Sequence, residues 1–444
     1  MKKKRICSFV TLGCKVNQYE TDFMAQTLLS AGYVVKPLSE ESDYVIINTC
    51  TVTNEADRKS RQMIRKAKKI ATDCITIAMG CSVQVMSPGV HKIADYQFGN
   101  GEKTEIARII QSIETGKSLP VMDRAYWLRH DQLACTINTS GSKTRQNIMI
   151  QEGCTNTCTY CKIYHARGTR SISKDSDMIV KEINEVGQNS CGEFILTGIN
   201  LGEYDFKGVK LPELMKKIDR SCNPEYRIRL SSLNPEDVTD EMCESLQMPR
   251  FCPHIHLSIQ SGSDAVLRKM NRKYTFDTVV NAVEKLRRID PLFSVSCDII
   301  VGFPSETEDN FHSTLELIKL IKPLKTHVFR FSPKRGTPAA IMKDPINGIV
   351  KKERFMELNR LATEISRQVR GKHIGKIRRI IVENSDHHTI IGHDVYYLKH
   401  LLKRSGKNLT EGDQIQTKIL EVPKKSEPDE VNATIVSLYE RRLD

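Results

Sequence analysis

A chain of 444 residues with 39% hydrophobic and 27% charged residues has the composition of a globular protein with two or three domains. It contains no run of about 18 apolar residues, and the apolar run after the basic first residues stops at Gly13, too early for a signal peptide. We therefore expect a cytoplasmic protein with no membrane partner. Residues 321–379 hold 16 Lys and Arg against 4 Asp and Glu. This local excess of positive charge favours a polyanionic partner over a merely solvated helix face.

Three short apolar runs in the first hundred residues each lead to a cysteine. The runs cover residues 6–12, 44–48 and 74–79, and they precede Cys14, Cys50 and Cys81. Apolar strands that alternate with helical patterns predict a parallel α/β sheet, which we assign to an amino-terminal α/β domain at residues 1–118. The carboxyl ends of parallel strands share one edge, where ligands bind. We therefore expect the three thiols to converge there instead of being unrelated buried cysteines.

The middle of the chain repeats a strand–helix pattern six times. The candidate strands are residues 148–151, 194–197, 228–231, 254–260, 295–301 and 326–331. Helical segments such as 179–186 and 279–287 separate them. This pattern predicts a partial (β/α)6 barrel over residues 140–373, with its site on the carboxyl face of the strands.

The last part of the chain has short β-rich runs separated by turn residues. These runs are residues 379–382, 389–392, 414–421 and 431–437. They predict a small antiparallel β-barrel over residues 374–440. A basic stretch within it includes Lys399, Lys403 and Arg404, which we consider candidates for RNA binding. The alternative is a cap that only stabilises the fold.

A loop after the first barrel strand carries Cys154, Cys158 and Cys161 in the spacing C-x3-C-x2-C. Three thiolates can hold a 4Fe–4S cluster and leave one iron open. That iron can chelate S-adenosylmethionine (SAM), which then carries the difficult chemistry. The alternative is a structural zinc site completed by His165, although zinc ligands more often come as two separated pairs.

The other eight cysteines mostly have apolar neighbours, which predicts small buried thiols instead of ligands. They are Cys7, Cys74, Cys135, Cys191, Cys222, Cys243, Cys252 and Cys297.

Six motifs, taken in order, resemble those of the radical SAM methylthiotransferases, and in particular the branch that acts on threonylcarbamoyladenosine in tRNA. They are TLGCKVNQYE at residues 11–20, IQEGC at 150–154, TGIN at 197–200, SIQSGS at 258–263, VGFPSET at 301–307 and GTPAA at 336–340. The resemblance implies a radical SAM barrel followed by an RNA-binding TRAM domain. It also implies that Cys14, Cys50 and Cys81 hold an auxiliary 4Fe–4S cluster, while Cys154, Cys158 and Cys161 hold the cluster that binds SAM.

The same resemblance implies the reaction. One SAM would donate a methyl group to sulfur and a second would provide the radical, so that a methylthio group is inserted at C2 of the adenine at tRNA position 37. The expected partners are tRNA, an electron donor such as flavodoxin or ferredoxin, and a sulfur donor. We expect SAM contacts from Gly198, Asn200 and Gln260. We expect phosphate contacts from a second basic group, Arg268, Lys269, Arg272 and Lys273.

Two alternatives remain open at this point. The same chemistry could act on isopentenyl-adenosine in tRNA or on an aspartate of a ribosomal protein. A third possibility belongs to another class, namely a non-enzymatic RNA-binding protein whose metal sites only brace the fold.

Overall fold

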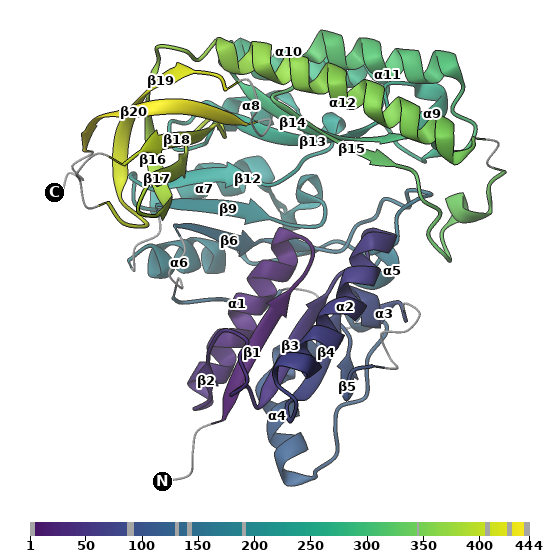
Figure 1. Cartoon of the computed structure of the whole chain (residues 1–444), viewed down its shortest axis with the longest axis vertical. Coiled ribbons are helices and arrows are strands. Elements are labelled where there is room, and N and C mark those ends of the chain that lie inside the picture. Colours follow the sequence, from purple (N-terminus) through teal and green to yellow (C-terminus); the bar gives the residue numbers. More distant parts are fainter. Residues whose placement is uncertain are drawn as a thin grey trace.

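The computed structural model describes residues 5–86, 93–128, 133–139, 144–188, 192–343, 346–404, 409–423 and 429–438. The predicted domain bounds at 140 and 440 lie outside these residues, as does Cys191. Figure 1 shows the amino-terminal region below, a larger α/β region above it, and a β-barrel at the upper left. Among the described helices, none has both the length and the apolar character needed to cross a bilayer.

The amino-terminal region is a parallel sheet with the strand order β2-β1-β3-β4-β5. Its strands are β1 (Ile6–Thr11), β2 (Val34–Val35), β3 (Tyr44–Thr49), β4 (Ile75–Gly80) and β5 (Tyr96–Phe98). Its helices are α1 (Lys15–Ser30), α2 (Asn54–Ile70), α3 (Cys81–Gln84) and α4 (Ile106–Thr115). Apolar side chains of β3 point alternately to both faces, so Ile46 packs with α1 and α4 while Ile47 packs with α2. The predicted parallel α/β fold is confirmed, and β2 and β5 were missed because they are so short.

Six parallel strands form the middle region in chain order. They are β6 (Arg145–Met149), β9 (Glu193–Thr197), β12 (Arg227–Leu230), β13 (His254–Gln260), β14 (Ser294–Val301) and β15 (Lys325–Arg330). The first three and the last three make separate sheets. Leu233, just past β12, joins the two sheets, since its N–H donates to the carbonyl of His256 and its carbonyl accepts from the N–H of Ser258. The predicted partial barrel is therefore confirmed.

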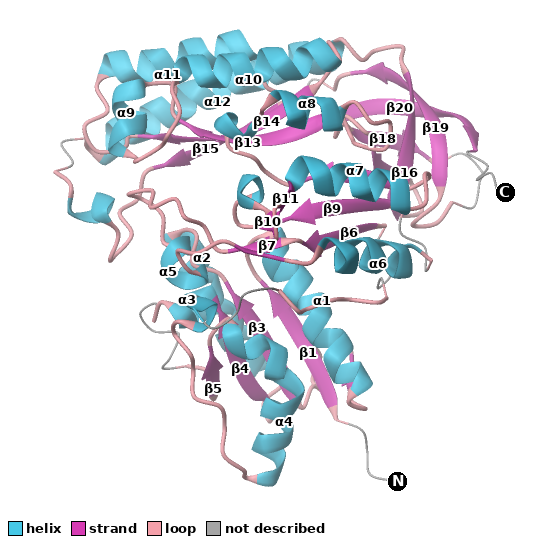
Figure 2. Cartoon of the chain, turned by 180° about the vertical axis from the view of Figure 1, so that it is seen from behind, coloured by secondary structure: helices cyan, strands magenta, loops and turns pink. Residues whose placement is uncertain are grey.

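Helices cover the outer face of these strands. Figure 2 shows α6 and α7 beside β6 and β9, and α10, α11 and α12 as a layer over the other half. The helices are α5 (Ile163–Arg167), α6 (Ser176–Gly187), α7 (Leu211–Ser221), α8 (Asp240–Leu246), α9 (Asp264–Lys269), α10 (Phe276–Ile289), α11 (Glu308–Ile321) and α12 (Gly348–Gly371). Two short strand pairs accompany them, β7 (Gln151–Glu152) with β8 (Ile172–Ser173), and β10 (Asp205–Phe206) with β11 (Val209–Lys210).

The carboxyl-terminal region is a closed barrel with the order β16-β17-β18-β20-β19. Its strands are β16 (Ile377–Ser385), β17 (Thr389–His393), β18 (Lys399–Lys403), β19 (Gln414–Glu421) and β20 (Glu430–Leu438). The expectation of a purely antiparallel barrel needs one correction, because β18 and β20 run parallel. Five strands cannot alternate direction all the way around a closed barrel, so one neighbouring pair must be parallel. β18 was read only as a basic stretch, since two lysines flank its short apolar core.

The carboxyl-terminal β-barrel packs against the amino ends of the strands of the partial (β/α) barrel. A buried ion cluster forms this contact. Glu193 at the start of β9 pairs with Arg227 and Arg229 of β12, each at 2.9 Å. Both guanidinium groups then donate to backbone carbonyls of the carboxyl-terminal region, among them those of His393 and Asp394. All three charged side chains are almost fully buried. This contact fixes the two regions against each other.

Removing the shared carboxylate should weaken this contact strongly. We expect Glu193→Ala to destabilise the protein by about 3–5 kcal/mol, because two buried guanidinium groups lose their counter-ion. The matched control is Glu225→Ala, which removes a partly exposed partner of Arg379 at the same interface and should cost about 0–1 kcal/mol. Denaturant unfolding of the two variants measures the difference. Equal effects would contradict this account of the interface.

Candidate active site

A single cavity of about 890 Å³ brings the predicted site residues together. All six candidate cysteine ligands line it, and so do Gly198, Asn200 and Gln260. Its walls come from all three regions, since the amino-terminal sheet edge covers the carboxyl ends of the barrel strands and Tyr397 lies at their amino ends.

The first cysteine triad sits on adjacent strands of the amino-terminal sheet. Cys14 caps the start of α1, Cys50 follows β3 directly, and Cys81 is the first residue of α3 after β4. Gly13 makes their approach possible, because it adopts a left-handed φ of 99° and a Cβ there would lie 2.7 Å from Cys50 Sγ. The predicted convergence of these strand ends is therefore what the fold produces.

Five of the six sulfur atoms accept hydrogen bonds from nitrogen donors, whereas Cys14 Sγ donates to Asn17 Oδ1. In the second triad, Asn200 Nδ2 donates to Cys154 Sγ at 3.7 Å, and Arg272 donates to Cys158 Sγ at 3.3 Å. The backbone N–H of Ile163 donates to Cys161 Sγ at 3.3 Å.

The first triad has the same kind of support. The N–H of Val52 donates to Cys50 Sγ at 3.5 Å, and Asn100 Nδ2 donates to Cys81 Sγ at 3.8 Å. Donors of this kind stabilise thiolate ligands and tune the potential of iron–sulfur clusters.

The spacing of the sulfurs fits a cluster better than a single zinc ion. Zinc with Zn–S bonds of about 2.3 Å would bring its sulfur ligands to within about 4 Å of one another. Neither cysteine triad is among the groups of described residues whose ligand atoms all lie within 4.8 Å of one another. His165 is exposed, stacks on Tyr164 at 4.2 Å between ring centroids, and does not line the cavity. The zinc alternative therefore finds no support.

Burial disfavours the thiolate form of two of these cysteines in the absence of a metal. It raises the pKa of Cys50 and of Cys154 to about 12. Such thiols become thiolates when a metal ion supplies the compensating charge.

A buried ion network in the cavity wall was not predicted. Arg167 of α5 is fully buried, donates to Glu152 at 2.8 Å and to Asn17 Oδ1 at 2.7 Å, and pairs with Glu20. Burial alone would raise the pKa of Glu20, but the charges of Arg167 and Lys103 lower it to about 2. The network ties α1 to the chain segment that follows the second triad. A charged residue gives no sequence signal for such burial, although Glu20 ends the first family motif.

The residues predicted to contact SAM lie beside the second triad. A Cβ at position 198 would meet Gln151 Oε1 at 2.8 Å, so Gly198 is needed for close packing there. Gln260 has a φ of 68°, a left-handed conformation that is rare outside glycine and frequent at functional sites. The SAM contacts themselves stay predictions.

The predicted RNA-binding residues separate into different environments. Arg272 faces the cavity, while Arg268, Lys269 and Lys273 are exposed on the surface nearby. In the β-barrel, Lys403 is exposed. Lys399 pairs there with Glu430 at 2.8 Å, and Arg404 donates to the carbonyl of Asp386 at 2.8 Å. Contact with RNA stays a prediction for all of them.

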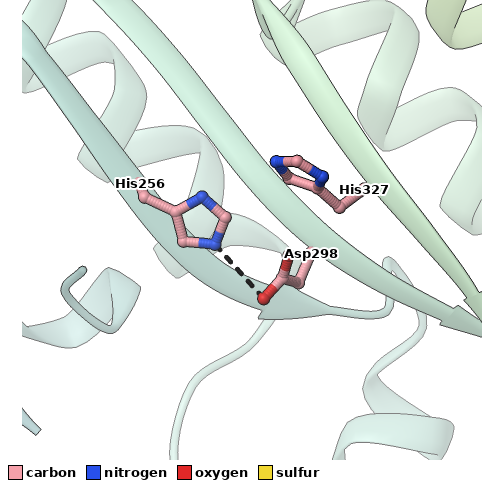
Figure 3. A group of neighbouring side chains, drawn as sticks. All are labelled: His256, Asp298 and His327. Atoms are coloured by element: carbon pink, nitrogen blue, oxygen red, sulfur yellow. Dashed lines mark ion pairs between the residues drawn. The ribbon is translucent and has the colours of Figure 1, made fainter. Parts of the chain in front are cut away.

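Three polar side chains that line the cavity from the barrel strands were missed by the sequence analysis. Figure 3 shows His256, Asp298 and His327 projecting toward one another from β13, β14 and β15. His256 Nε2 lies 3.2 Å from Asp298 Oδ2, and the ligand atoms of all three residues lie within 4.8 Å of one another. The usable signal was a set of polar residues in the middle of strands that otherwise read as apolar core.

Comparison with known proteins agrees with this geometry. Residues 148–318 match the family model described as the radical SAM superfamily, and residues 7–98 match one described as uncharacterized protein family UPF0004. The threonylcarbamoyladenosine tRNA methylthiotransferase MtaB of Thermotoga maritima is 40% identical over 90% of this chain and 91% of its own. The chain belongs to the radical SAM tRNA methylthiotransferase family. As a member of it, the protein is an enzyme that uses SAM and 4Fe–4S clusters.

Two further relatives place the chain within this family. The MtaB protein of Bacillus subtilis is 34% identical over 93% of each chain. The tRNA-2-methylthio-N(6)-dimethylallyladenosine synthase of Endomicrobium trichonymphae is 33% identical over 84% of this chain and 87% of its own. Among solved structures, the radical SAM methyltransferase TsrM of Kitasatospora setae has a similar fold. It gives a TM-score of 0.60 at 14% identity over 76% of this chain and 75% of its own.

The hydrogen bond from Arg272 to Cys158 predicts an effect on the cluster expected at this thiolate. Donors to ligand sulfurs stabilise the reduced cluster, so Arg272→Met should make its reduction potential more negative and slow reductive cleavage of SAM. A redox titration followed by electron paramagnetic resonance measures the potential. Arg268→Met, on the exposed side of α9, serves as the control and should leave the potential unchanged. An unchanged potential in Arg272→Met would contradict this role.

Proposed function

We propose that this enzyme methylthiolates C2 of threonylcarbamoyladenosine at tRNA position 37, with one SAM as methyl donor and a second as radical source. The observation that carries the proposal is the single cavity lined by both cysteine triads, since methyl transfer to sulfur and radical formation must occur within reach of one base. The MtaB relatives support this substrate at up to 40% identity.

In this proposal the six cysteines have two roles. Cys154, Cys158 and Cys161 hold the cluster that binds SAM, and Cys14, Cys50 and Cys81 hold the auxiliary cluster. The bound groups supply the radical and sulfur chemistry. Asn200 and Gln260 orient SAM beside the second triad. The C2–H bond of an adenine has no acidic proton, so the chain needs to position the base and exclude water more than it needs to supply a catalytic base.

The RNA-binding role falls to the exposed basic residues around the cavity. We assign residues 1–118 to the auxiliary-cluster domain, 140–373 to the radical SAM core and 374–440 to a TRAM domain. Arg268, Lys269 and Lys273 on the core and Lys403 on the barrel are placed to meet phosphates. The remaining partners are an electron donor such as flavodoxin or ferredoxin and a sulfur donor. A tRNA substrate is also consistent with the predicted cytoplasmic location.

The second candidate substrate is isopentenyl-adenosine in tRNA. Relatives named for that reaction are about as long and are 33% identical, so the chemistry would be unchanged. The polar side chains His256, Asp298 and His327 in the cavity favour the threonylcarbamoyl group, because an isopentenyl group offers no hydrogen bonds. No observation favours an aspartate of a ribosomal protein.

Metal content tests the two-cluster assignment. After anaerobic reconstitution we expect about eight irons per chain, and about four after Cys14, Cys50 and Cys81 are all replaced by alanine. Cys7→Ala, which removes a buried thiol outside the cavity, should keep about eight. Analysis of iron and acid-labile sulfide measures this. A holoprotein with zinc in place of iron would support the RNA-binding alternative instead.

Nucleoside mass spectrometry tests the reaction and its substrate together. In tRNA from cells that lack the gene, the methylthio form of threonylcarbamoyladenosine should be absent, and the wild-type gene should restore it. Neither Cys158→Ala nor Cys50→Ala should restore it, because each removes a ligand of one cluster.

The two variants should differ in vitro. Purified Cys50→Ala should still cleave SAM reductively, whereas Cys158→Ala should not. Full methylthiolation by Cys50→Ala would refute the two-cluster assignment. If the wild-type gene instead restores methylthio-isopentenyl-adenosine, isopentenyl-adenosine becomes the proposed substrate.

A further inference from the structure

We propose that Lys15, Asn147 and His327 form a polar subsite that recognises the N6 substituent of the target adenine, with Lys15 binding its carboxylate. The proposal rests on the function proposed above and names the part of the cavity that selects the substrate. The three side chains line the same cavity as the cysteines and Tyr397.

Lys15 is a cation in the cavity wall without a protein counter-ion. It lines the cavity at the first turn of α1, and its ammonium forms no hydrogen bond or ion pair with another described residue. The cavity arginines are engaged, since Arg167 pairs with Glu20 and Glu152, and Arg145 pairs with Glu383. Arg272 donates to Cys158 Sγ and to Asn234 Oδ1. Lys15 is therefore the cavity cation best able to receive an anion from the substrate.

Lys15 also lies close to the histidine-bearing strands. The pKa of the buried His254 on β13 is lowered first by burial, then by Arg229, and further by the charge of Lys15. His254 and His256 both bond to the hydroxyl of Ser296. The ammonium of Lys15 lines the same cavity as the three side chains that Figure 3 draws, His256, Asp298 and His327.

Asn147 supplies the clearest sign of a missing ligand. Its side chain lines the cavity from β6 and is 7% exposed, yet Oδ1 has no hydrogen-bond partner. Its Nδ2 donates to Gln18 Oε1 at 3.0 Å, so the amide is held with Oδ1 free. A buried acceptor without a partner is unfavourable, and a ligand N–H or O–H would satisfy it.

His327 is a second polar side chain in the cavity wall that has no hydrogen-bond partner among the described residues. It lines the cavity from β15, and no described residue forms a hydrogen bond or ion pair with it, while its neighbour His256 is held by Ser296 and Asp298. Its imidazole can donate or accept. A threonylcarbamoyl group carries a urea, a hydroxyl and a carboxylate, which match an acceptor, an imidazole and an ammonium.

An apolar substituent would leave these three groups unpaired. Sites built to hydrogen-bond a substrate discriminate strongly against analogues that lack the bonding atoms. The stretch Lys15-Val16-Asn17-Gln18 thus contributes to selection physically, because Lys15 provides the charge and Gln18 orients Asn147.

The test compares two anticodon stem-loop RNAs with the reconstituted holoenzyme. One carries threonylcarbamoyladenosine at position 37, and the other carries the same nucleoside with its carboxylate converted to a neutral methylamide. Dissociation constants and methylthiolation kcat/KM are measured for both. A charge-assisted hydrogen bond corresponds to a preference of about tenfold to a hundredfold for the carboxylate RNA.

The variants separate recognition from general electrostatics. Lys15→Gln should reduce the preference to near one, and Lys15→Arg should retain most of it. His327→Phe should lower kcat/KM for the threonylcarbamoyl RNA while the preference due to the carboxylate remains. Lys59→Gln removes an exposed charge outside the cavity, and it should affect both RNAs equally.

Three results would overturn the inference or its basis. If wild-type enzyme discriminates and Lys15→Gln discriminates equally, the subsite is wrong while the proposed function stands. If a chelator abolishes the preference and Mn²⁺ restores it, a metal ion on His256, Asp298 and His327 recognises the substrate instead of Lys15. If wild-type enzyme modifies neither RNA, the proposed function itself fails.

Discussion

A buried guanidinium joins the two regions that enclose the cavity. Two cysteine triads from different regions can face one space only if the amino-terminal sheet is fixed against the barrel. Arg167 provides that constraint by bonding to Asn17 and Glu20 of α1 and to Glu152 of β7. A buried charge is costly unless every partner is in place. The pairing therefore tolerates little displacement, and it sets the position of Cys14 relative to Cys154.

A second buried ion cluster closes the opposite end of the partial (β/α) barrel. Glu193 shares two arginines, and both also bond to carbonyls of the carboxyl-terminal region. The amino-terminal sheet edge with its cysteine ligands thus closes one end of the cavity, and Tyr397 lies at the other end. Between them lie polar side chains in mid-strand, where a barrel of this kind would otherwise be filled with apolar residues. Ion pairs at both ends and open polar groups in the middle are what make the space available to a substrate.

Much of this arrangement was predictable from local patterns. Apolar runs followed by Cys14, Cys50 and Cys81 placed three thiols at one sheet edge, and the six strand–helix repeats gave the barrel. Local patterns failed where the deciding contact was distant in sequence. Arg167 and His256 were not singled out and Arg272 was expected to meet phosphate, because nothing near them in the chain indicates that they will line a buried cavity. The parallel pair in the β-barrel was also invisible, since it follows from closure of five strands and not from any one of them.

Tyr397 has a consequence for the shape of the catalytic chamber. It lies in the turn between β17 and β18, has a left-handed φ of 69°, and stacks on His254 at 4.6 Å between ring centroids. Asp394 shapes that turn by accepting from the N–H groups of Tyr396 and Leu398. The depth of the catalytic chamber is therefore set by an element outside the barrel. Exchanging the carboxyl-terminal region between related enzymes would therefore change the shape of the chamber as well as the surface that the β-barrel presents.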